Sequence, residues 1–266
     1  MKTVQAFFEK DSSTLTYVVF DPETKDAIII DPVLNYEPNG STYWFEQIEQ
    51  IKDFVHSQEL HVHYCIDTHA HADHISATAE LKKYFPQMQS VIGKPVTEVQ
   101  DIFASILSLS TLKTDGSQFD LLIEDGQTLQ AGSIHIQAIH TPGHTPTCTS
   151  YHIDDMLFTG DTLFMPDFGT GRCDFPKGSA KDLYHSVHEK LYTLPDQTRV
   201  FVGHDYQPNG RALAWETTIA DSKNHNIHLK ADTTEAEFVS FRQERDKTLN
   251  APRLLLPSIQ INVNGG

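Results

Sequence analysis

The sequence predicts an α/β fold. Short apolar runs of strand length alternate with longer segments whose apolar residues recur at helical spacing, as between Phe45 and Gln58. Several of the apolar runs are followed closely by a histidine or an aspartate. Because functional side chains often lie on loops held by a rigid scaffold, this repetition predicts a site.

Length and composition limit the classes of protein. The 266 residues suffice for one sizeable core, and we expect residues 1–266 to form a single domain. The net charge of −16 disfavours nucleic acid as a partner. No apolar stretch reaches the roughly 18 residues of a membrane span, and Met1 to Asp11 lacks the apolar core of a signal peptide. Three widely spaced cysteines favour a reducing cytoplasm.

The first half of the chain is expected to begin a buried sheet. Leu15–Phe20 and Ala27–Ile30 are predicted strands, joined by the polar turn at residues 21–26. The spacing of apolar residues then predicts a helix over Phe45–Gln58, a strand over His61–Ile66 and a helix over Ile75–Tyr84.

The second half contains an insertion and a helical tail. Residues 96–120 combine a helical pattern over Val96–Leu109 with a polar end, and we expect them to lie over one side of the domain. Further predictions are a strand over Ile134–Ile139, a helix over Asp182–Leu194, a strand over Val200–Val202 and helices over Arg211–Ser222 and Thr234–Thr248. In the tail, 211–266, the apolar stretch Leu254–Ile261 could bury within the chain or in a homodimer.

The densest group of metal-binding side chains follows the strand His61–Ile66. His69, His71, Asp73 and His74 lie within six positions. Imidazole and carboxylate together suit zinc and iron. Since side chains alternate along an extended segment, His69 and His71 are expected to point to one side. The cluster could hold one metal ion or two side by side.

Three later strand ends each supply another such residue. His144 lies in a Thr-Pro-Gly-His loop after Ile134–Ile139, and proline and glycine favour a tight turn there. Asp161 follows an apolar run that ends at Phe158, and His204 follows Val200–Val202.

The order of these motifs resembles the metallo-β-lactamase superfamily over nearly the whole chain. The resemblance implies a four-layer αββα sandwich with the metal site at one edge of the two sheets. It also implies a first metal site of His69, His71 and His144, a second of Asp73, His74 and His204, and Asp161 as the bridging carboxylate.

Shorter motifs resemble different branches of that superfamily. Gly160–Phe164 resembles glyoxalase II, whereas Gly171–Phe175, Ala180–Lys190 and His204–Tyr206 resemble persulfide dioxygenases. The insertion and the longer tail resemble the related β-lactamase-hydrolase-like proteins.

Two activities follow from these resemblances. In a dioxygenase that converts glutathione persulfide, or a similar small persulfide, with O2 to sulfite and thiol, His69, His144 and Asp161 would hold one Fe(II). In a glyoxalase II-like hydrolase of glutathione thioesters, all seven residues would hold two zinc or iron ions around a hydroxide. A non-catalytic metal-bearing sensor is a third alternative, which a degenerate site would favour. Sequence alone does not separate the first two, because the ligand set is the same.

Further roles are expected for residues around the ligands. Asp161, His71 and Asp73 are the expected catalytic residues. Arg172, Tyr184 and Tyr206 are candidates to bind the thiol carrier. Arg172 could instead pair with Asp174, and both tyrosines could serve in packing.

Overall fold

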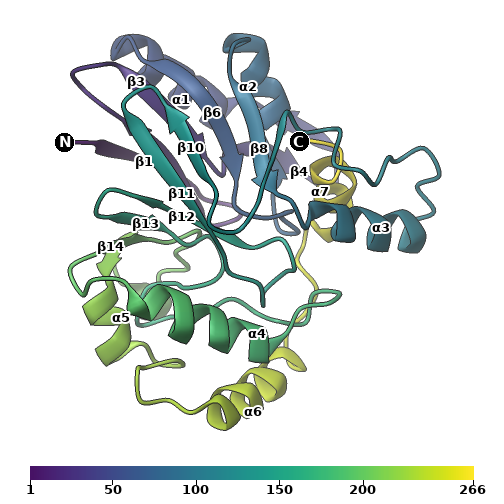
Figure 1. Cartoon of the computed structure of the whole chain (residues 1–266). Coiled ribbons are helices and arrows are strands. Elements are labelled where there is room, and N and C mark those ends of the chain that lie inside the picture. The colour runs from purple at the N-terminus through teal and green to yellow at the C-terminus, as the bar shows by residue number, and fades with distance from the viewer.

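Two six-stranded sheets pack face to face, and helices cover the outer face of each (Figure 1). This computed structural model describes all residues from 1 to 266. The predicted four-layer αββα sandwich is confirmed.

The first sheet has the strand order β1-β2-β3-β6-β8-β9. Its strands are β1 (Thr3–Glu9), β2 (Thr14–Phe20), β3 (Asp26–Ile30), β6 (His61–Asp67), β8 (Gln89–Gly93) and β9 (Leu121–Ile123). Because β3, β6, β8 and β9 run parallel, their carboxyl ends lie at one edge of the sheet. A small third sheet is formed by β4 (Val33–Glu37), β5 (Thr42–Trp44) and β7 (Ile75–Ser76).

The second sheet runs in chain order from β10 to β15. Its strands are β10 (Thr128–Ala131), β11 (Ile134–His140), β12 (Thr149–Ile153), β13 (Met156–Phe158), β14 (Arg199–Phe201) and β15 (Glu216–Thr218). Only the pairing of β13 with β14 is parallel, and these two strands end beside each other at Phe158 and Phe201.

Strand β2 shows why the apolar runs are continuous rather than alternating. Leu15, Tyr17 and Val19 point into the core between the two sheets. Val18 and Phe20 point the other way, into the core under the first helices. Both faces are buried, so both sets of side chains are apolar.

The helices divide between the two outer faces (Figure 1). α1 (Glu46–Ser57) and α2 (Thr78–Tyr84) cover the first sheet, while α4 (Ala180–His185), α5 (Ile219–His225) and α6 (Glu235–Asp246) cover the second. α4 continues into a π-helical turn at Ser186–Lys190 and a 3-10 turn at Leu191–Thr193, and a further 3-10 turn spans Pro208–Gly210. No helix is both long and apolar enough to cross a bilayer.

The predicted helix over Arg211–Ser222 is wrong. Residues 211–215 are irregular, Glu216–Thr218 form β15, and α5 begins only at Ile219. Arg211 bonds to Asp167 and Asp205 instead of starting a helix. α5 begins after Thr218, whose hydroxyl accepts the N–H of Asp221 at 3.1 Å as its N-terminal cap. The helix predicted from Ile75 likewise begins later, at Thr78, because Ile75 and Ser76 pair with β4.

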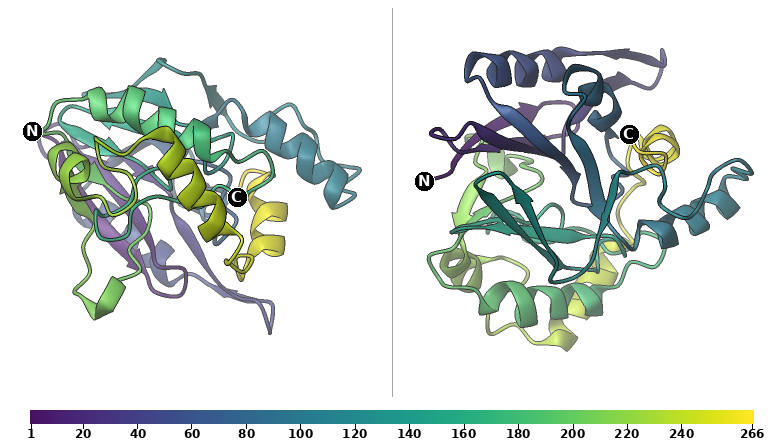
Figure 2. Two further views of the ribbon diagram at one scale, coloured as in Figure 1. Left: turned by 90° about the horizontal axis from the view of Figure 1, so that it is seen from below. Right: turned by 45° about the horizontal axis from the view of Figure 1, so that its top comes forward.

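The insertion and the tail meet at one edge of the sandwich. Figure 2 shows α3 (Val96–Ile106) projecting from the main body, with α7 (Leu255–Asn262) nearby. Ile259 and Val263 pack with Val99 and Phe103 in a buried cluster. Leu254 and Ile259 of the apolar stretch are therefore buried against their own chain, while Leu256 is exposed.

Candidate metal centre

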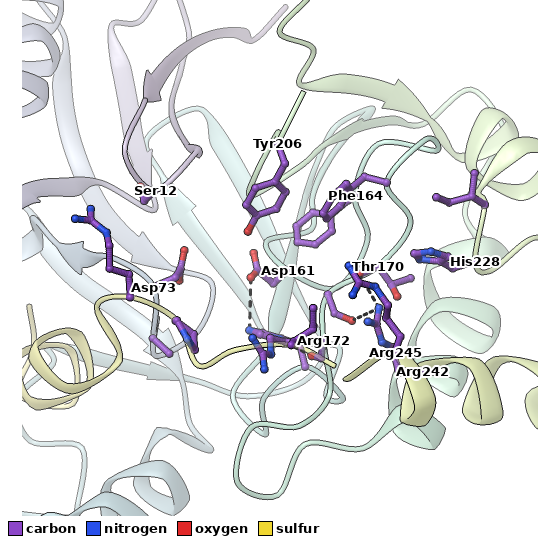
Figure 3. Close-up of a pocket in the computed structure, with 18 of the residues that line it drawn as sticks. Ser12, Asp73, Asp161, Phe164, Thr170, Arg172, Tyr206, His228, Arg242 and Arg245 are labelled. Carbon is purple, nitrogen blue, oxygen red and sulfur yellow. Dashed lines mark hydrogen bonds and ion pairs between the residues drawn. The ribbon is translucent and has the colours of Figure 1, made fainter. Parts of the chain in front are cut away.

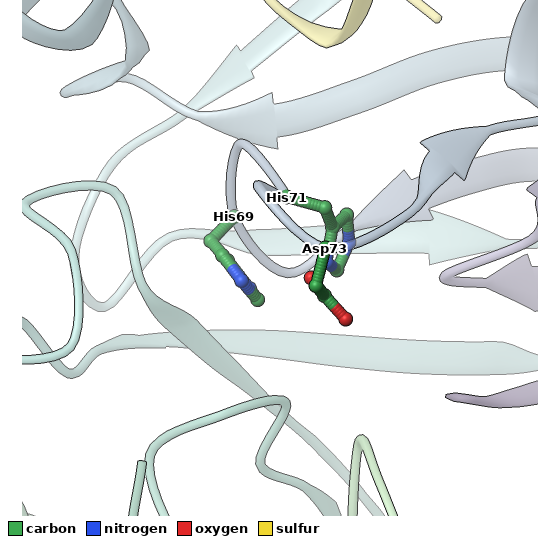
Figure 4. A group of neighbouring side chains, drawn as sticks. All are labelled: His69, His71 and Asp73. Atoms are coloured by element: carbon green, nitrogen blue, oxygen red, sulfur yellow. The ribbon is translucent and has the colours of Figure 1, made fainter. Parts of the chain in front are cut away.

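The loop from His69 to His74 leaves the carboxyl end of β6 and carries four side chains that could bind metal. His69, His71 and Asp73 extend from it to the same side (Figure 4). The ligand atoms of these three residues lie within 4.8 Å of one another. His69 and His71 are each 1 % exposed, so these polar groups face a buried space.

The second sheet adds the remaining groups. His144 follows β11, Asp161 follows β13 and His204 follows β14. His144 Nε2 lies 3.5 Å from Asp161 Oδ2, and His204 Nε2 lies 3.2 Å from Asp161 Oδ1 and 3.1 Å from Asp73 Oδ2. The strand ends of both sheets thus bring together all seven residues that the sequence predicted as ligands.

These residues form two further groups, each of which shares one residue with the group within the loop. His69, His144 and Asp161 make one group, and Asp73, His74 and His204 make another, each with its ligand atoms within 4.8 Å of one another. The arrangement could accept one metal ion or two adjacent ions.

Unpartnered buried atoms show that the donor set fits a metal ion. Nε2 of His69, Nδ1 of His71, Nε2 of His74, Oδ2 of Asp73 and Oδ1 of Asp161 are buried without a hydrogen bond. Buried polar atoms normally have partners. Five such atoms in one cluster, all of metal-ligating types, indicate that a cation completes their environment.

In His144 and His71, the ring nitrogen that points away from the cluster has a hydrogen-bond partner. His144 Nδ1 donates to the carbonyl of Arg172 at 2.6 Å, which leaves Nε2 directed at Asp161. His71 Nε2 lies 3.0 Å from Asp31 Oδ1 and leaves Nδ1 free. Such partners set the orientation and tautomer of a metal-binding histidine.

Asp31 is a site residue that the sequence analysis missed. It follows β3, and its carboxylate accepts the backbone N–H of Thr68 at 2.7 Å and the Thr68 hydroxyl at 2.8 Å. The sequence did contain an indication of this role, because Asp31 directly follows an apolar strand, and Asp161 also lies just after one.

Charges in the cluster alter the proton affinities of its members. Burial alone would lower the pKa of His204, but Asp161 and Asp73 raise it to about 10. Burial would also lower the pKa of His71, but Asp31 and Asp67 raise it to about 9. Burial and the neighbouring His71 lower the pKa of His69, which favours a neutral imidazole.

A cavity of about 490 Å³ reaches the cluster from solvent. Asp73, His144 and Asp161 lie in its wall (Figure 3). Four arginines also line it, despite the net charge of −16: Arg172, Arg242, Arg245 and Arg253. Sequence analysis identified only the first of these, because the other three come from the tail.

The arginines are not equivalent. Arg172 pairs with Asp174, with Nη2 2.6 Å from Oδ2, and donates to the carbonyl of Asn250 at 2.7 Å. Arg242 is buried and pairs with Asp246 at 2.7 Å. Arg245 and Arg253 are exposed and have no carboxylate partner, so their charges face the cavity uncompensated.

The two candidate tyrosines lie in different places. Tyr206 lines the cavity, stacks on His204 with ring centroids 5.5 Å apart, and directs its hydroxyl toward Asp161 (Figure 3). Tyr184 does not line the cavity. Its ring stacks on His188 at 4.2 Å and its hydroxyl donates to the carbonyl of Thr233 at 3.2 Å, so the structure gives it a packing position.

This combination defines a class: an αββα sandwich with a histidine and aspartate metal centre at the edge of its sheets. The family model described as the metallo-beta-lactamase superfamily matches residues 10–204. The chain therefore belongs to the metallo-β-lactamase superfamily. This membership supports a metal-dependent enzyme.

Relatives within the superfamily carry several names. A probable metallo-hydrolase of Burkholderia pseudomallei is 42% identical over 99% of this chain and 93% of its own length. Glyoxylase B2 of Dictyostelium discoideum is 43% identical over 99% and 90%. The human mitochondrial persulfide dioxygenase ETHE1 is 37% identical over 76% and 68%. Among solved structures, ETHE1 from Myxococcus xanthus has a TM-score of 0.79 and 32% identity over 98% of both chains.

Proposed function

We propose that the protein is a non-haem Fe(II) sulfur dioxygenase that oxidises glutathione persulfide, or a similar small persulfide. The persulfide, O2 and water would yield the thiol, sulfite and protons. The observation that carries this proposal is the similarity over nearly the full chain to the Myxococcus xanthus ETHE1 structure, joined by the human relative named as a persulfide dioxygenase.

In this proposal one Fe(II) is held by His69, His144 and Asp161. An iron ion bound by two imidazoles and one carboxylate supplies open positions for a persulfide sulfur and for O2. The unpartnered Nε2 of His69 and Oδ1 of Asp161, and the fixed Nδ1 of His144, support this set.

The remaining residues of the cluster orient ligands and hold protons. His204 Nε2 lies 3.1 Å from Asp73 Oδ2 and 3.2 Å from Asp161 Oδ1, and it would hold both carboxylates toward the site. His71, held by Asp31, would keep the loop backbone and its neighbour His69 in place.

The cationic wall of the cavity would bind the carrier of the persulfide. Arg245 and Arg253 present unpaired guanidinium groups, which suit the carboxylates of a peptide-like thiol such as glutathione. Tyr206 would offer its hydroxyl close to Asp161, and Phe164 and Phe168 would exclude water from that side.

A hydrolase with two metal ions is the second candidate. It is favoured by the group of Asp73, His74 and His204, because Nε2 of His74 and Oδ2 of Asp73 are also buried without a hydrogen bond. The relative named Glyoxylase B2 fits this alternative. Its reaction would be attack of a metal-activated hydroxide on a glutathione thioester.

One experiment separates the two. Protein purified without O2 is analysed for metal content, and then assayed for O2 uptake with glutathione persulfide and for cleavage of S-lactoylglutathione. One iron per chain with persulfide-dependent O2 uptake would support the dioxygenase. Two metal ions with thioester cleavage and no O2 uptake would reject it in favour of the hydrolase.

A reducing cytoplasm remains our predicted compartment. Cys65, Cys148 and Cys173 are all buried free thiols, which is consistent with that prediction. The homodimer likewise stays a prediction.

A further inference from the structure

The loop that carries His69 to His74 is bonded from behind by one side chain of α7. Asn262 Nδ2 donates to the carbonyl oxygens of His71 and His74, each at 2.8 Å. Its Oδ1 accepts the backbone N–H of Ser76 at 2.9 Å. Asn262 is 4 % exposed, so a single buried amide makes three hydrogen bonds to a six-residue stretch of backbone.

These bonds satisfy groups that have no other protein partner. The carbonyls of His71 and His74 lie in an irregular loop, outside the ladders of the sheets. A buried carbonyl without a hydrogen bond is unfavourable. Removing the amide of Asn262 would therefore favour rotation of the peptide planes at His71 and His74, and with them the side chains on either side.

The position of Asn262 is itself fixed by the insertion. Ile259 and Val263 pack with Ala70, Val99 and Phe103. Gln100 of α3, fully buried, donates from Nε2 to the carbonyl of Val263 at 2.8 Å. Its Oε1 accepts the N–H of Gly116 at 3.0 Å, which ties the polar end of the insertion to the same point. α7 is thus held between α3 and the loop.

We propose that Asn262 is a positioning residue of the metal centre, and that the insertion and α7 together form its support. Asn262 sets the backbone at His71 and His74, and so the direction in which His71, Asp73 and His74 face the other ligands of the cluster. The inference rests on the proposed metal-binding role of this loop. It holds for one metal ion or two, and for either proposed reaction.

The test is the metal affinity of the variant Asn262→Leu, which removes all three hydrogen bonds at similar volume. Co(II) is the probe, because competition with a chelator gives its affinity and its visible absorption reports ligand geometry. Loss of an orienting partner weakens metal binding by about 10- to 100-fold. We expect a weakening in that range and an altered Co(II) spectrum.

The matched control is Asn264→Leu. Asn264 lies two residues further along and is exposed, and its side chain donates only to the carbonyl of Gln260, at 3.0 Å. This variant should bind Co(II) as the parent does. Thermal unfolding of each metal-free protein separates a change in folding from a change in the site, because a merely structural residue would lower the melting temperature and leave the Co(II) spectrum of the folded protein unchanged.

Asn262→Ser serves as a second variant if the leucine protein does not fold. Its hydroxyl can donate to one carbonyl at most, so we expect a smaller loss of affinity in the same direction. The inference is overturned if the folded Asn262 variants bind Co(II) within about twofold of the parent with the parent's spectrum. If the parent protein shows no persulfide-dependent O2 uptake, the dioxygenase is rejected. Weaker Co(II) binding by the Asn262 variants would still support the inference in that case.

Discussion

The two faces of the His69–His74 loop differ in how their polar atoms are satisfied. One face is turned toward the other ligands, and we call it the cavity face because Asp73 on it lines the cavity. On this face, Nε2 of His69, Nδ1 of His71 and Nε2 of His74 are buried without partners. On the rear face, Asn262 bonds the carbonyls of His71 and His74, and Thr147 Oγ1 accepts the N–H of Ala70 at 3.2 Å. In this loop, the side-chain nitrogens that face the other ligands lack hydrogen bonds, while the backbone on the opposite side is bonded to the rest of the fold.

The largest effect should come from the cavity face. Asp161→Ala removes the carboxylate that lies between His144 and His204. Loss of an orienting partner weakens metal binding by about 10- to 100-fold, so loss of a direct ligand should lower metal affinity and turnover by more than about 100-fold. Metal analysis and initial rates measure this. Retention of parental turnover would contradict the assignment of the site.

The next effect tests the rear face. Asp31→Asn keeps the size of the side chain but removes one of the acceptors shared by His71 and Thr68. We expect metal affinity to fall by about 10- to 100-fold, because His71 loses its orienting carboxylate. Chelator competition measures it. Asp26→Asn, at a half-buried carboxylate paired with His63 at 2.7 Å and outside the metal cluster, is the control and should bind metal normally.

Arg245→Ala should affect the substrate and spare the metal. Arg245 lines the cavity without a carboxylate partner. A hydrogen bond to a charged group is worth about 1.5–3 kcal/mol, so KM for glutathione persulfide should rise by about tenfold or more with kcat little changed. Steady-state O2 uptake gives both constants.

Lys247→Ala is the control for that substitution. Lys247 lies just beyond α6 and pairs with Glu244, outside the large cavity. Its KM should equal that of the parent. An equal rise of KM in both variants would show that general charge, rather than Arg245, attracts the substrate.

The smallest effect concerns acid stability. Burial, with Arg242 and Arg245 nearby, lowers the pKa of His228 to about 4. A histidine kept neutral by the fold stabilises it above the unfolded pKa of about 6.5, and this contribution is lost as the pH falls from there toward 4. The unfolding free energy of the parent should therefore drop between pH 7.5 and pH 5. In His228→Gln this drop should be smaller by about 1 kcal/mol, a figure reduced to allow for solvent screening.

Urea unfolding of the metal-free proteins at the two pH values measures this difference. His225→Gln is a suitable control, since His225 is exposed on α5. If His228→Gln and the parent lost equal stability on acidification, His228 would not be held neutral by the fold.

The cavity face was predictable from sequence, whereas most of the rear face was not. His69, Asp161 and His204 each follow an apolar run, and parallel strands bring their ends together. Asp31 showed the same signal and could have been found. Asn262 had no local signal, because its role depends on contacts 188 and 191 residues away along the chain.

The tail was also where secondary structure was least predictable. The apolar residues of 211–222 show helical spacing, but Arg211 instead forms ion pairs with Asp205 and Asp167, and Glu216 pairs with Arg199 of β14. Such long-range contacts override local propensity. For the same reason Arg245 and Arg253 could not be assigned to the cavity from their sequence alone.

The hydrogen bonds of Asn262 have a consequence for how the protein is made. During synthesis the loop at 69–74 leaves the ribosome long before α7, and a domain generally folds as a unit. The backbone of the loop therefore cannot be fixed until Asn262, 191 residues after His71, has been synthesised. Full metal uptake would then follow completion of the fold, so the nascent chain would not need to hold the ion during translation.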